Sequence, residues 1–238
     1  MKKMSSVYCA IGLGLALQAN GLGVSPMLVY FHAGNNVQDI TVENADQVVE
    51  YASITPLYLQ NMGLSTVKAV PFNGTNPQAF GLMITPTKMA LQPQASRKIR
   101  LVNLMTNVQE DRVYTLTVTN INPTEKVEAL SHGSSAQMSL TYGYKIRVFV
   151  LPINPLPIIH AKRNGTSVTI TNTGNSYISL RSGQLCDLSG GNCKPLTNGL
   201  DYHALYVGNS WTFNLPRDGV VKYSGVYAET KNMAVQSN

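Results

Sequence analysis

Charged side chains are scarce in this sequence. They make up 13% of the 238 residues, against roughly 25% in an average soluble chain, while 44% of the residues are hydrophobic. This balance argues against a charge-rich cytosolic enzyme, a disordered tail, a coiled coil and a polytopic membrane protein. The polar residues are mainly Thr, Ser, Asn and Gln in short alternating runs, which suit half-buried strands. The composition therefore predicts a secreted β protein of one or two domains.

The sequence also lacks the motifs of common catalytic and metal sites. It has no His-Glu-x-x-His pair, no Gly-x-Ser-x-Gly turn and no Cys-x-x-Cys pair. We interpret Asp111 and Arg112 as a local charge pair at the start of a strand, not as an acid and base pair. We therefore expect a protein that is not an enzyme and that binds no metal, cofactor or small-molecule substrate. The four histidines are widely scattered: His32, His132, His160 and His203.

Features of nucleic-acid binding are weak as well. The net charge is +6, and there is one Trp among 8% aromatic residues, which gives no stacking platform beyond ordinary β composition. Arg97, Lys98 and Arg100 fit the outer face of a strand. We expect no nucleic-acid partner.

The N-terminal apolar run is too short to span a membrane. It extends from Val7 to Leu17, 11 residues, whereas a spanning helix needs roughly 20. Two lysines precede it, and the small residues Ala19, Gly21 and Gly23 follow it, an order typical of a secretory signal peptide. We expect residues 1–23 to be such a peptide, cleaved after one of these three small residues; a permanent anchor is the alternative.

Cysteine is rare, and its placement is informative. Cys9 lies within the expected signal peptide, which leaves Cys186 and Cys193 in the exported chain. An even pair around a turn-forming loop in an exported protein favours a disulfide bond. A zinc site would need further ligands at close spacing.

From Met27 onward the dominant pattern is an alternation of period two. Breaks rich in Asn, Gly and Pro separate the alternating runs, and no stretch keeps a 3.6-residue apolar repeat over three turns. Many short strands with frequent turns predict an all-β fold of Ig-like sandwiches. The expected strands are residues 27–31, 39–42, 48–54, 80–84, 98–104, 113–119, 137–150 and 167–172.

Three prolines between residues 152 and 157 mark the best internal boundary. A central strand cannot hold them, because proline lacks the amide that a ladder needs. We expect a Pro-rich elbow at residues 153–157 that joins an N-terminal Ig-like domain, residues 24–152, to a C-terminal one, residues 158–238. An ordinary loop inside one domain is the alternative.

The longest expected strand ends at this elbow. At about 14 residues it exceeds the usual 5 to 6. One parity of the strand is an unbroken row of apolar and aromatic side chains: Met138, Leu140, Tyr142, Tyr144, Ile146, Val148 and Val150. This row has two explanations: it fills the core of its own sandwich, or the strand extends beyond its sheet and presents an edge and an apolar face to another protein, which monomers usually avoid.

Several segments occur in an order typical of one protein family. Residues 80–101 carry Ile-Thr-Pro and then Ile-Arg-Leu, residues 110–123 end in Asn-Pro, and residues 146–152 read Ile-Arg-Val-Phe-Val-Leu-Pro. Residues 169–175 and the cysteine loop follow the elbow. Together these segments resemble the periplasmic chaperones of the chaperone/usher pilus pathway, most closely the alternate branch, over nearly the whole mature chain.

The resemblance implies two Ig-like sandwiches in a boomerang shape and a chaperone in the periplasm of a Gram-negative bacterium. Such chaperones lend their long G1 strand to a pilus subunit that lacks its last strand, and deliver the subunit to an outer-membrane usher. The donated side chains would be Met138, Leu140 and Tyr142, with Tyr144 at the margin. Pilus subunits and the usher are the expected partners; self-association of the free protein is left open.

The family also holds the subunit's C-terminal carboxylate with two basic side chains. Arg147 matches the G1 position, where a guanidinium can bind a carboxylate through two parallel hydrogen bonds. The second position lies on the first strand, but residues 26–30 have no Arg or Lys, and Lys145 is the expected substitute. Leu151 replaces an arginine that fixes the domain angle in the conventional branch. Without the resemblance, Arg147 would be interpreted as an exposed sheet charge.

A secreted Ig-like pilus subunit or adhesin is the competing function. A subunit would carry a detachable N-terminal extension before an incomplete domain, whereas here residues 24–31 lead directly into the first expected strand. A subunit expressed alone would aggregate, polymerise or be degraded. A chaperone would remain monomeric in periplasmic extract.

Overall fold

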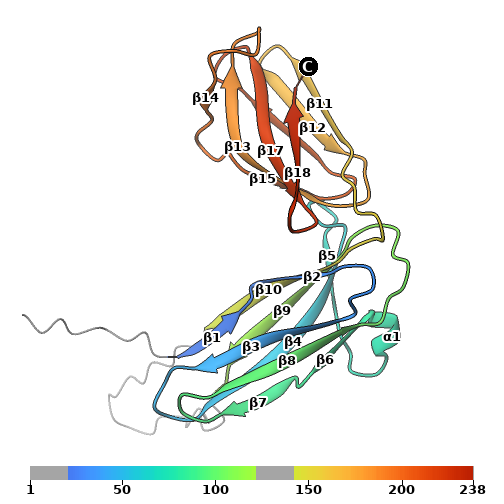
Figure 1. The fold of residues 1–238 in the computed structure, drawn as a ribbon, viewed down its shortest axis with the longest axis vertical. Coiled ribbons are helices and arrows are strands. Elements are labelled where there is room, and N and C mark those ends of the chain that lie inside the picture. The colour runs from blue at the N-terminus through green and yellow to red at the C-terminus, as the bar shows by residue number, and fades with distance from the viewer. Residues whose placement is uncertain (1–20, 122–141, 238) are drawn as a thin grey trace, which may run out of the picture.

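The structure, a computed structural model, describes residues 21–121 and 142–237. Figure 1 shows two β-sandwiches set at an angle to each other, in the boomerang shape that the resemblance implies. The strands of the first sandwich lie within residues 22–150 and those of the second within residues 159–236. The predicted all-β fold of two Ig-like sandwiches is confirmed. Over the described ranges, no helix is long and apolar enough to cross a membrane.

Two sheets form the first sandwich. One has the strand order β1-β3-β8-β6, and the other has the order β2-β10-β9-β4-β5 with β7 beside β4. Only the β2–β10 pair is parallel among the pairs of these described strands. The bounds are β1 Leu22–Ser25, β2 Leu28–Phe31, β3 Val37–Asn44, β4 Glu50–Gln60, β5 Lys68–Pro71, β6 Leu82–Thr85, β7 Lys88–Leu91, β8 Ser96–Asn103, β9 Arg112–Asn120 and β10 Gly143–Val150.

Alternation along the strands builds the core of this sandwich. In β8, Ile99 and Leu101 are fully buried, while Lys98 and Arg100 face the solvent. Both basic side chains lie beside Asp39 on β3; Arg100 Nε is 3.0 Å from its Oδ1. The outer face of this strand is therefore basic, as predicted, and its charge is partly balanced by a neighbouring carboxylate.

The chain changes sheets between β1 and β2. The break contains a cis peptide bond before Pro26. Before it, β1 pairs antiparallel with β3 in one sheet; after it, β2 pairs parallel with β10 in the other. The sequence predicted a strand at residues 27–31 and missed β1, although proline after a short apolar run is a signal for such a break.

A single helical turn, α1 (Pro77–Phe80), precedes β6. The side chain of Asn76 accepts a hydrogen bond of 2.9 Å from the backbone N–H of Ala79, and Gly81 ends the turn in the left-handed conformation, with φ of 88°. Glycine suits this position because a Cβ there would lie 2.7 Å from the Tyr114 hydroxyl oxygen. The expected strand at residues 80–84 therefore starts later, at Leu82.

The second sandwich has one sheet with the order β11-β12-β16 and another with the order β14-β13-β17-β18, in which β15 also pairs with β13. Its core includes Ile178, Leu180 and Val221, all nearly or fully buried. The predicted disulfide between Cys186 and Cys193 is present. The bounds are β11 Ile159–Asn164, β12 Ser167–Asn172, β13 Ile178–Cys186, β14 Lys194–Pro195, β15 His203–Leu205, β16 Ser210–Asn214, β17 Val220–Tyr227 and β18 Lys231–Gln236.

Candidate functional site

Strand β10 has one edge that is only half covered. β2 pairs with Arg147 through Val150, and a further hydrogen bond of 3.0 Å joins the Arg147 N–H to the carbonyl of Met27. Beyond this point, residues 143–146 pair only with β9 among the described strands. The chain's switch to the other sheet before β2 causes this gap. An uncovered strand edge offers backbone donors and acceptors to another chain.

The inward row of β10 agrees with the predicted alternation. Ile146, Val148 and Val150 are at most 2% exposed and belong to the core. Tyr142 and Tyr144 continue the row, half-buried, and pack against the same core. The structure therefore shows that one part of the row is buried in the protein's own core and that the part nearer the start of the strand is only half-buried. Met138 and Leu140 lie outside the described residues.

The outward row of β10 carries the two candidate anchor residues. Lys145 is opposite Thr117 of β9, and Arg147 is opposite Thr115, so both point from the same face of the sheet. Lys145 is exposed and Arg147 is half-buried. Arg147 Nη1 lies 3.9 Å from the Met62 sulfur. Within the described chain it forms no salt bridge with a carboxylate.

Arg147 also lies near the joint between the sandwiches. Burial raises the pKa of the Tyr206 hydroxyl, and the positive charge of Arg147 opposes this increase. Tyr206 belongs to the second sandwich, and Met62 to the first. An open groove of about 540 Å³ near the joint has both residues among its lining, together with Asp111 and Tyr177. The guanidinium is thus placed where two sandwiches meet and where a carboxylate from another chain could approach it.

An aromatic stack joins the two sandwiches. The ring of Phe149, at the end of β10, stacks on Tyr30 at 5.2 Å and on Tyr177 at 4.5 Å, and Tyr177 stacks on Tyr206 at 5.7 Å. The hydroxyl groups of Tyr30 and Tyr177 are hydrogen bonded at 2.9 Å. Leu151 is 4% exposed within the same cluster. Leu151 therefore contributes apolar packing to the joint between the sandwiches.

Asp111 forms the main polar link across the joint. Its Oδ2 accepts hydrogen bonds from the Tyr177 N–H at 2.7 Å and the Ser176 hydroxyl at 3.0 Å, and its own N–H donates to the carbonyl of Asn175. Burial, opposed by these bonds, raises the pKa of the Asp111 carboxyl to about 7. The sequence interpretation of a local charge pair is replaced by this link, since Arg112 instead lies over the Tyr58 ring at 4.1 Å.

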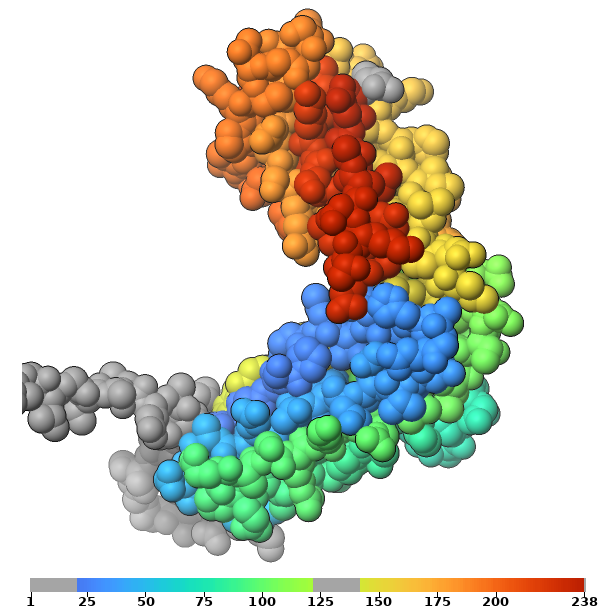
Figure 2. Space-filling model, in the orientation of Figure 1, coloured from blue at the N-terminus to red at the C-terminus, as the bar shows by residue number. Residues whose placement is uncertain are grey.

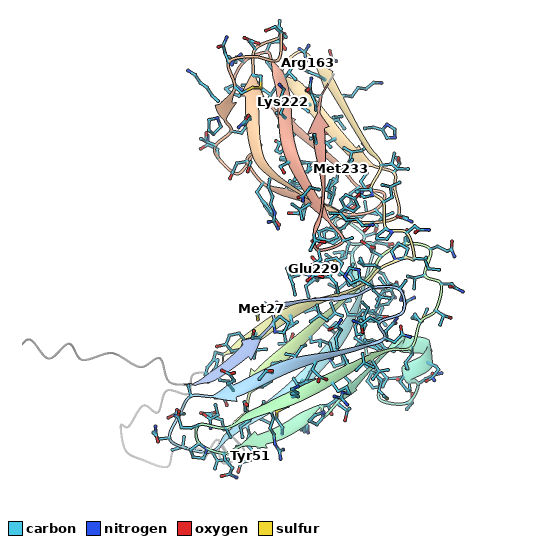
Figure 3. The ribbon with its side chains drawn as sticks, viewed as in Figure 1. Met27, Tyr51, Arg163, Lys222, Glu229 and Met233 are labelled. Atoms are coloured by element: carbon cyan, nitrogen blue, oxygen red, sulfur yellow. A yellow bond between two sulfur atoms is a disulfide. The ribbon has the colours of Figure 1, made fainter. Side chains whose placement is uncertain are left out.

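A hairpin of the second sandwich completes the joint. Figure 2 shows the turn between β17 and β18, in red, meeting the N-terminal strands of the first sandwich, in blue. At this contact the His32 ring nitrogen lies 3.2 Å from a carboxylate oxygen of Glu229, which Figure 3 places between the sandwiches. The orientation of β10 relative to the second sandwich is therefore held by the aromatic stack, by Asp111, by this hairpin and by a hydrogen bond of 2.8 Å from the Asn209 side chain to the carbonyl of Met62.

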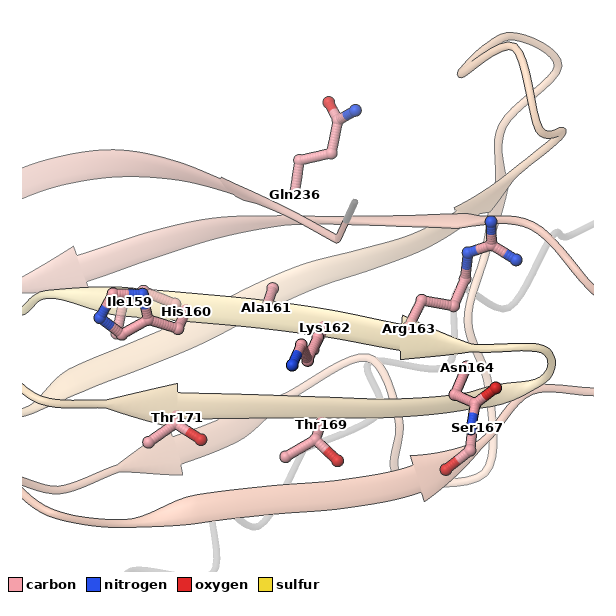
Figure 4. A pocket seen from close by; sticks show the side chains of 10 residues that line it. All are labelled: Ile159, His160, Ala161, Lys162, Arg163, Asn164, Ser167, Thr169, Thr171 and Gln236. Atoms are coloured by element: carbon pink, nitrogen blue, oxygen red, sulfur yellow. The ribbon is translucent and has the colours of Figure 1, made fainter.

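The second sandwich has a groove of its own, which lies away from β10. It has a volume of about 820 Å³ and follows the edge strand β11, with Lys162, Arg163 and Thr169 on its walls (Figure 4). Arg163 is paired with Asp218. Within the described residues, no cluster of His, Cys, Asp and Glu could hold a metal ion. The structure brings none of the predicted site residues to this groove.

Comparison with known proteins identifies the family. A family model described as pili and flagellar-assembly chaperone, PapD N-terminal domain, matches residues 21–155. No match was found among curated protein sequences.

Three solved structures with a similar fold are distant in sequence. The class 5 fimbriae chaperone CfaA has 18% identity and a TM-score of 0.68, over 92% of this chain and 99% of that one. The E. coli chaperone DraB has 16% identity and a TM-score of 0.61, over 92% and 98%. A complex of the Salmonella enterica SafA pilin with the SafB chaperone has 14% identity and a TM-score of 0.59, over 93% and 97%. By the family match, which covers more than half of its residues, the chain belongs to the pilus assembly chaperones of the PapD family.

Proposed function

We propose that the protein is a periplasmic chaperone that captures pilus subunits by donating the β10 strand and delivers them to an outer-membrane usher. The observation that carries this proposal is the uncovered edge of residues 143–146, which continues an apolar inward row. A strand with free backbone groups and alternating apolar side chains can add to an incomplete sheet. One structure of similar fold is itself a chaperone bound to a pilin.

The donated side chains supply the affinity. Met138 and Leu140 are the next members of the inward row beyond Tyr142. Burying each large apolar side chain contributes roughly 1.5 to 3 kcal/mol. Two or more such side chains, together with backbone hydrogen bonds, suffice to stabilise a complex that can still be exchanged when the subunit moves to the usher.

Arg147 is the proposed anchor for the C-terminal carboxylate of the subunit. It has no carboxylate partner within the described chain, and it faces the joint beside Met62 and Tyr206. Lys145 lies one step further along the same face and is the proposed second cation. A carboxylate bound there would fix the register in which the subunit lies along β10.

Export and domain organisation complete the proposal. The N-terminal residues have the order of a signal peptide, which would take the chain to the periplasm. The second sandwich and residues 153–157 would act as a fixed platform and elbow. The competing interpretation as a pilus subunit is not favoured, because the matched family consists of assembly chaperones.

Replacement of Leu140 by a charged residue tests donor-strand capture. Leu140→Asp places a charge where an apolar pocket is expected, and the complex should weaken by tenfold or more, as burial of one such side chain implies. The measurement is co-purification of a co-expressed pilus subunit. Ser139→Asp, on the opposite parity, is the control and should retain capture. Undiminished co-purification with Leu140→Asp would show that this row is not donated.

A further inference from the structure

Tyr144 of β10 and Tyr142, which precedes β10, bind the backbone of β1. The N–H of Leu22 donates a hydrogen bond of 2.7 Å to the Tyr142 hydroxyl, and the Tyr144 hydroxyl donates one of 2.5 Å to the carbonyl of Leu22. The two rings lie edge to face, with centroids 6.3 Å apart. The backbone N–H and the carbonyl of Leu22 are thus hydrogen bonded to two consecutive tyrosines of the inward row.

These contacts join the edges of two different sheets. β1 is the edge strand of one sheet and has β3 as its partner, while this part of β10 has β9 as its partner in the other sheet. Leu22 itself is 3% exposed and belongs to the core of the first sandwich. Among the described strands, β1 and β10 are not paired through their backbones. The two tyrosine side chains therefore connect the two sheets at this side of the sandwich.

The position of the Tyr142 ring requires glycine before β1. Gly21 has φ of 131°, and a Cβ on it would lie 2.5 Å from the Tyr142 hydroxyl oxygen. The Gly21 carbonyl also accepts a hydrogen bond of 3.0 Å from the Ala45 N–H. The backbone at this end of β1 is thus held on both sides, and the ring fits closely against it.

A tyrosine that is bound in this way cannot also fill a pocket in another protein without first breaking its bond to Leu22. We propose that Tyr142 and Tyr144 are positioning residues that stay on the protein's own first strand when a subunit is bound, so that the donated apolar row ends at Leu140. This inference rests on the proposed function but divides the strand between side chains and backbone: the inward side chains from Tyr142 to Val150 stay in the chaperone, while the uncovered backbone edge of residues 143–146 remains available to the subunit. The subunit would then need pockets for Met138 and Leu140 and none for a tyrosine.

Hydrogen exchange of the free protein tests the lock on β1. Tyr142→Phe and Tyr144→Phe each remove one hydrogen bond and keep the ring, and exchange of the amides in residues 22–25 should become about fivefold faster in each and faster still in the double variant. Tyr202→Phe is the control, because Tyr202 is exposed and belongs to the second sandwich. Unchanged exchange in the double variant would overturn the lock. This measurement needs no subunit, so its outcome is independent of whether the chain is a chaperone.

The complex with the subunit tests the division of the strand. In the wild-type protein, exchange of the amides in residues 22–25 should be as slow in the complex as in the free protein. A photo-cross-linking residue in place of Leu140 should join to the subunit, while one in place of Tyr142 should join to β1. Fivefold faster exchange of β1 on subunit binding, or cross-linking of position 142 to the subunit, would overturn the proposal. Failure of the wild-type protein to capture any subunit would refute the proposed function instead.

Discussion

Asp111 makes the stability of the joint between the sandwiches dependent on pH. Its carboxyl is bonded to Tyr177 and Ser176 of the second sandwich, and its Oδ1 is buried with no hydrogen-bond partner in the structure. Burial is the main cause that raises the pKa to about 7, from an ordinary value of 3.8; the neighbouring Glu110 adds to it, and the two hydrogen bonds oppose it. Replacing Asp111 by Asn keeps the side-chain shape and an acceptor oxygen, and it removes the titration.

The magnitude follows from the two pKa values. One pKa unit corresponds to about 1.36 kcal/mol, so the difference between 3.8 and about 7 corresponds to about 4 kcal/mol. Partial access of solvent to the side chain reduces this to about 2 to 4 kcal/mol. Since the folded state holds the proton more tightly, this contribution is fully present below pH 4. It is lost as the pH rises through 7.

Urea unfolding between pH 4 and pH 8 measures this effect. The free energy of unfolding of the wild-type protein should fall by about 2 to 4 kcal/mol more over this range than that of Asp111→Asn. Asp201→Asn, which changes an exposed carboxylate of the second sandwich, is the control and should follow the wild-type curve. If the Asp111→Asn and wild-type curves run parallel from pH 4 to pH 7, the buried carboxyl does not titrate in this range and the reasoning is refuted.

Three further outcomes are expected. Arg147→Ala should reduce the periplasmic yield of subunit by tenfold or more, as loss of a charge-assisted hydrogen bond implies, while Lys162→Ala on β11 should leave it unchanged; a wild-type yield from the first variant would reject the anchor role. Cys186→Ser should lower the free energy of unfolding by about 2 to 3 kcal/mol, because the short ring no longer restricts the unfolded chain; an unchanged urea midpoint would contradict this. N-terminal sequencing of the exported protein should show that Leu22 is retained, because it is buried in the core and bonded to β10; a mature chain that begins at Val24 would refute it.

Alternation along the chain predicted the faces of the strands well. Residues 167–172 form β12 with the predicted bounds, and the inward row of β10 from Tyr142 to Val150 follows the expected parity. The disulfide was also foreseen, because two cysteines with a short turn between them have few other partners. These features depend on neighbours in the sequence, and so they can be read from it.

Features that depend on distant residues could not be predicted. Tyr30 and Tyr177 meet across the joint although 147 positions separate them, and no periodicity indicates such a contact. Asp111 illustrates the same limit: its neighbours in the sequence suggested a partner in Arg112, and its actual partners lie in the second sandwich. Strand β1 was missed because its first two residues fall within residues 1–23, the segment that the sequence indicates as a signal peptide. The alternation states which side of a sheet a residue faces, and tertiary packing decides what it meets there.

The apolar character of the joint has a consequence for the range of media in which the molecule can work. An angle held by exposed ion pairs loosens as ionic strength rises, because dissolved salt screens the attraction between charges. Contacts among Phe149, Tyr177 and Leu151 carry no net charge, and salt does not weaken them in this way. The aromatic part of the joint should therefore hold equally in dilute and in concentrated salt, and only the exposed contact between His32 and Glu229 should weaken as the salt concentration rises.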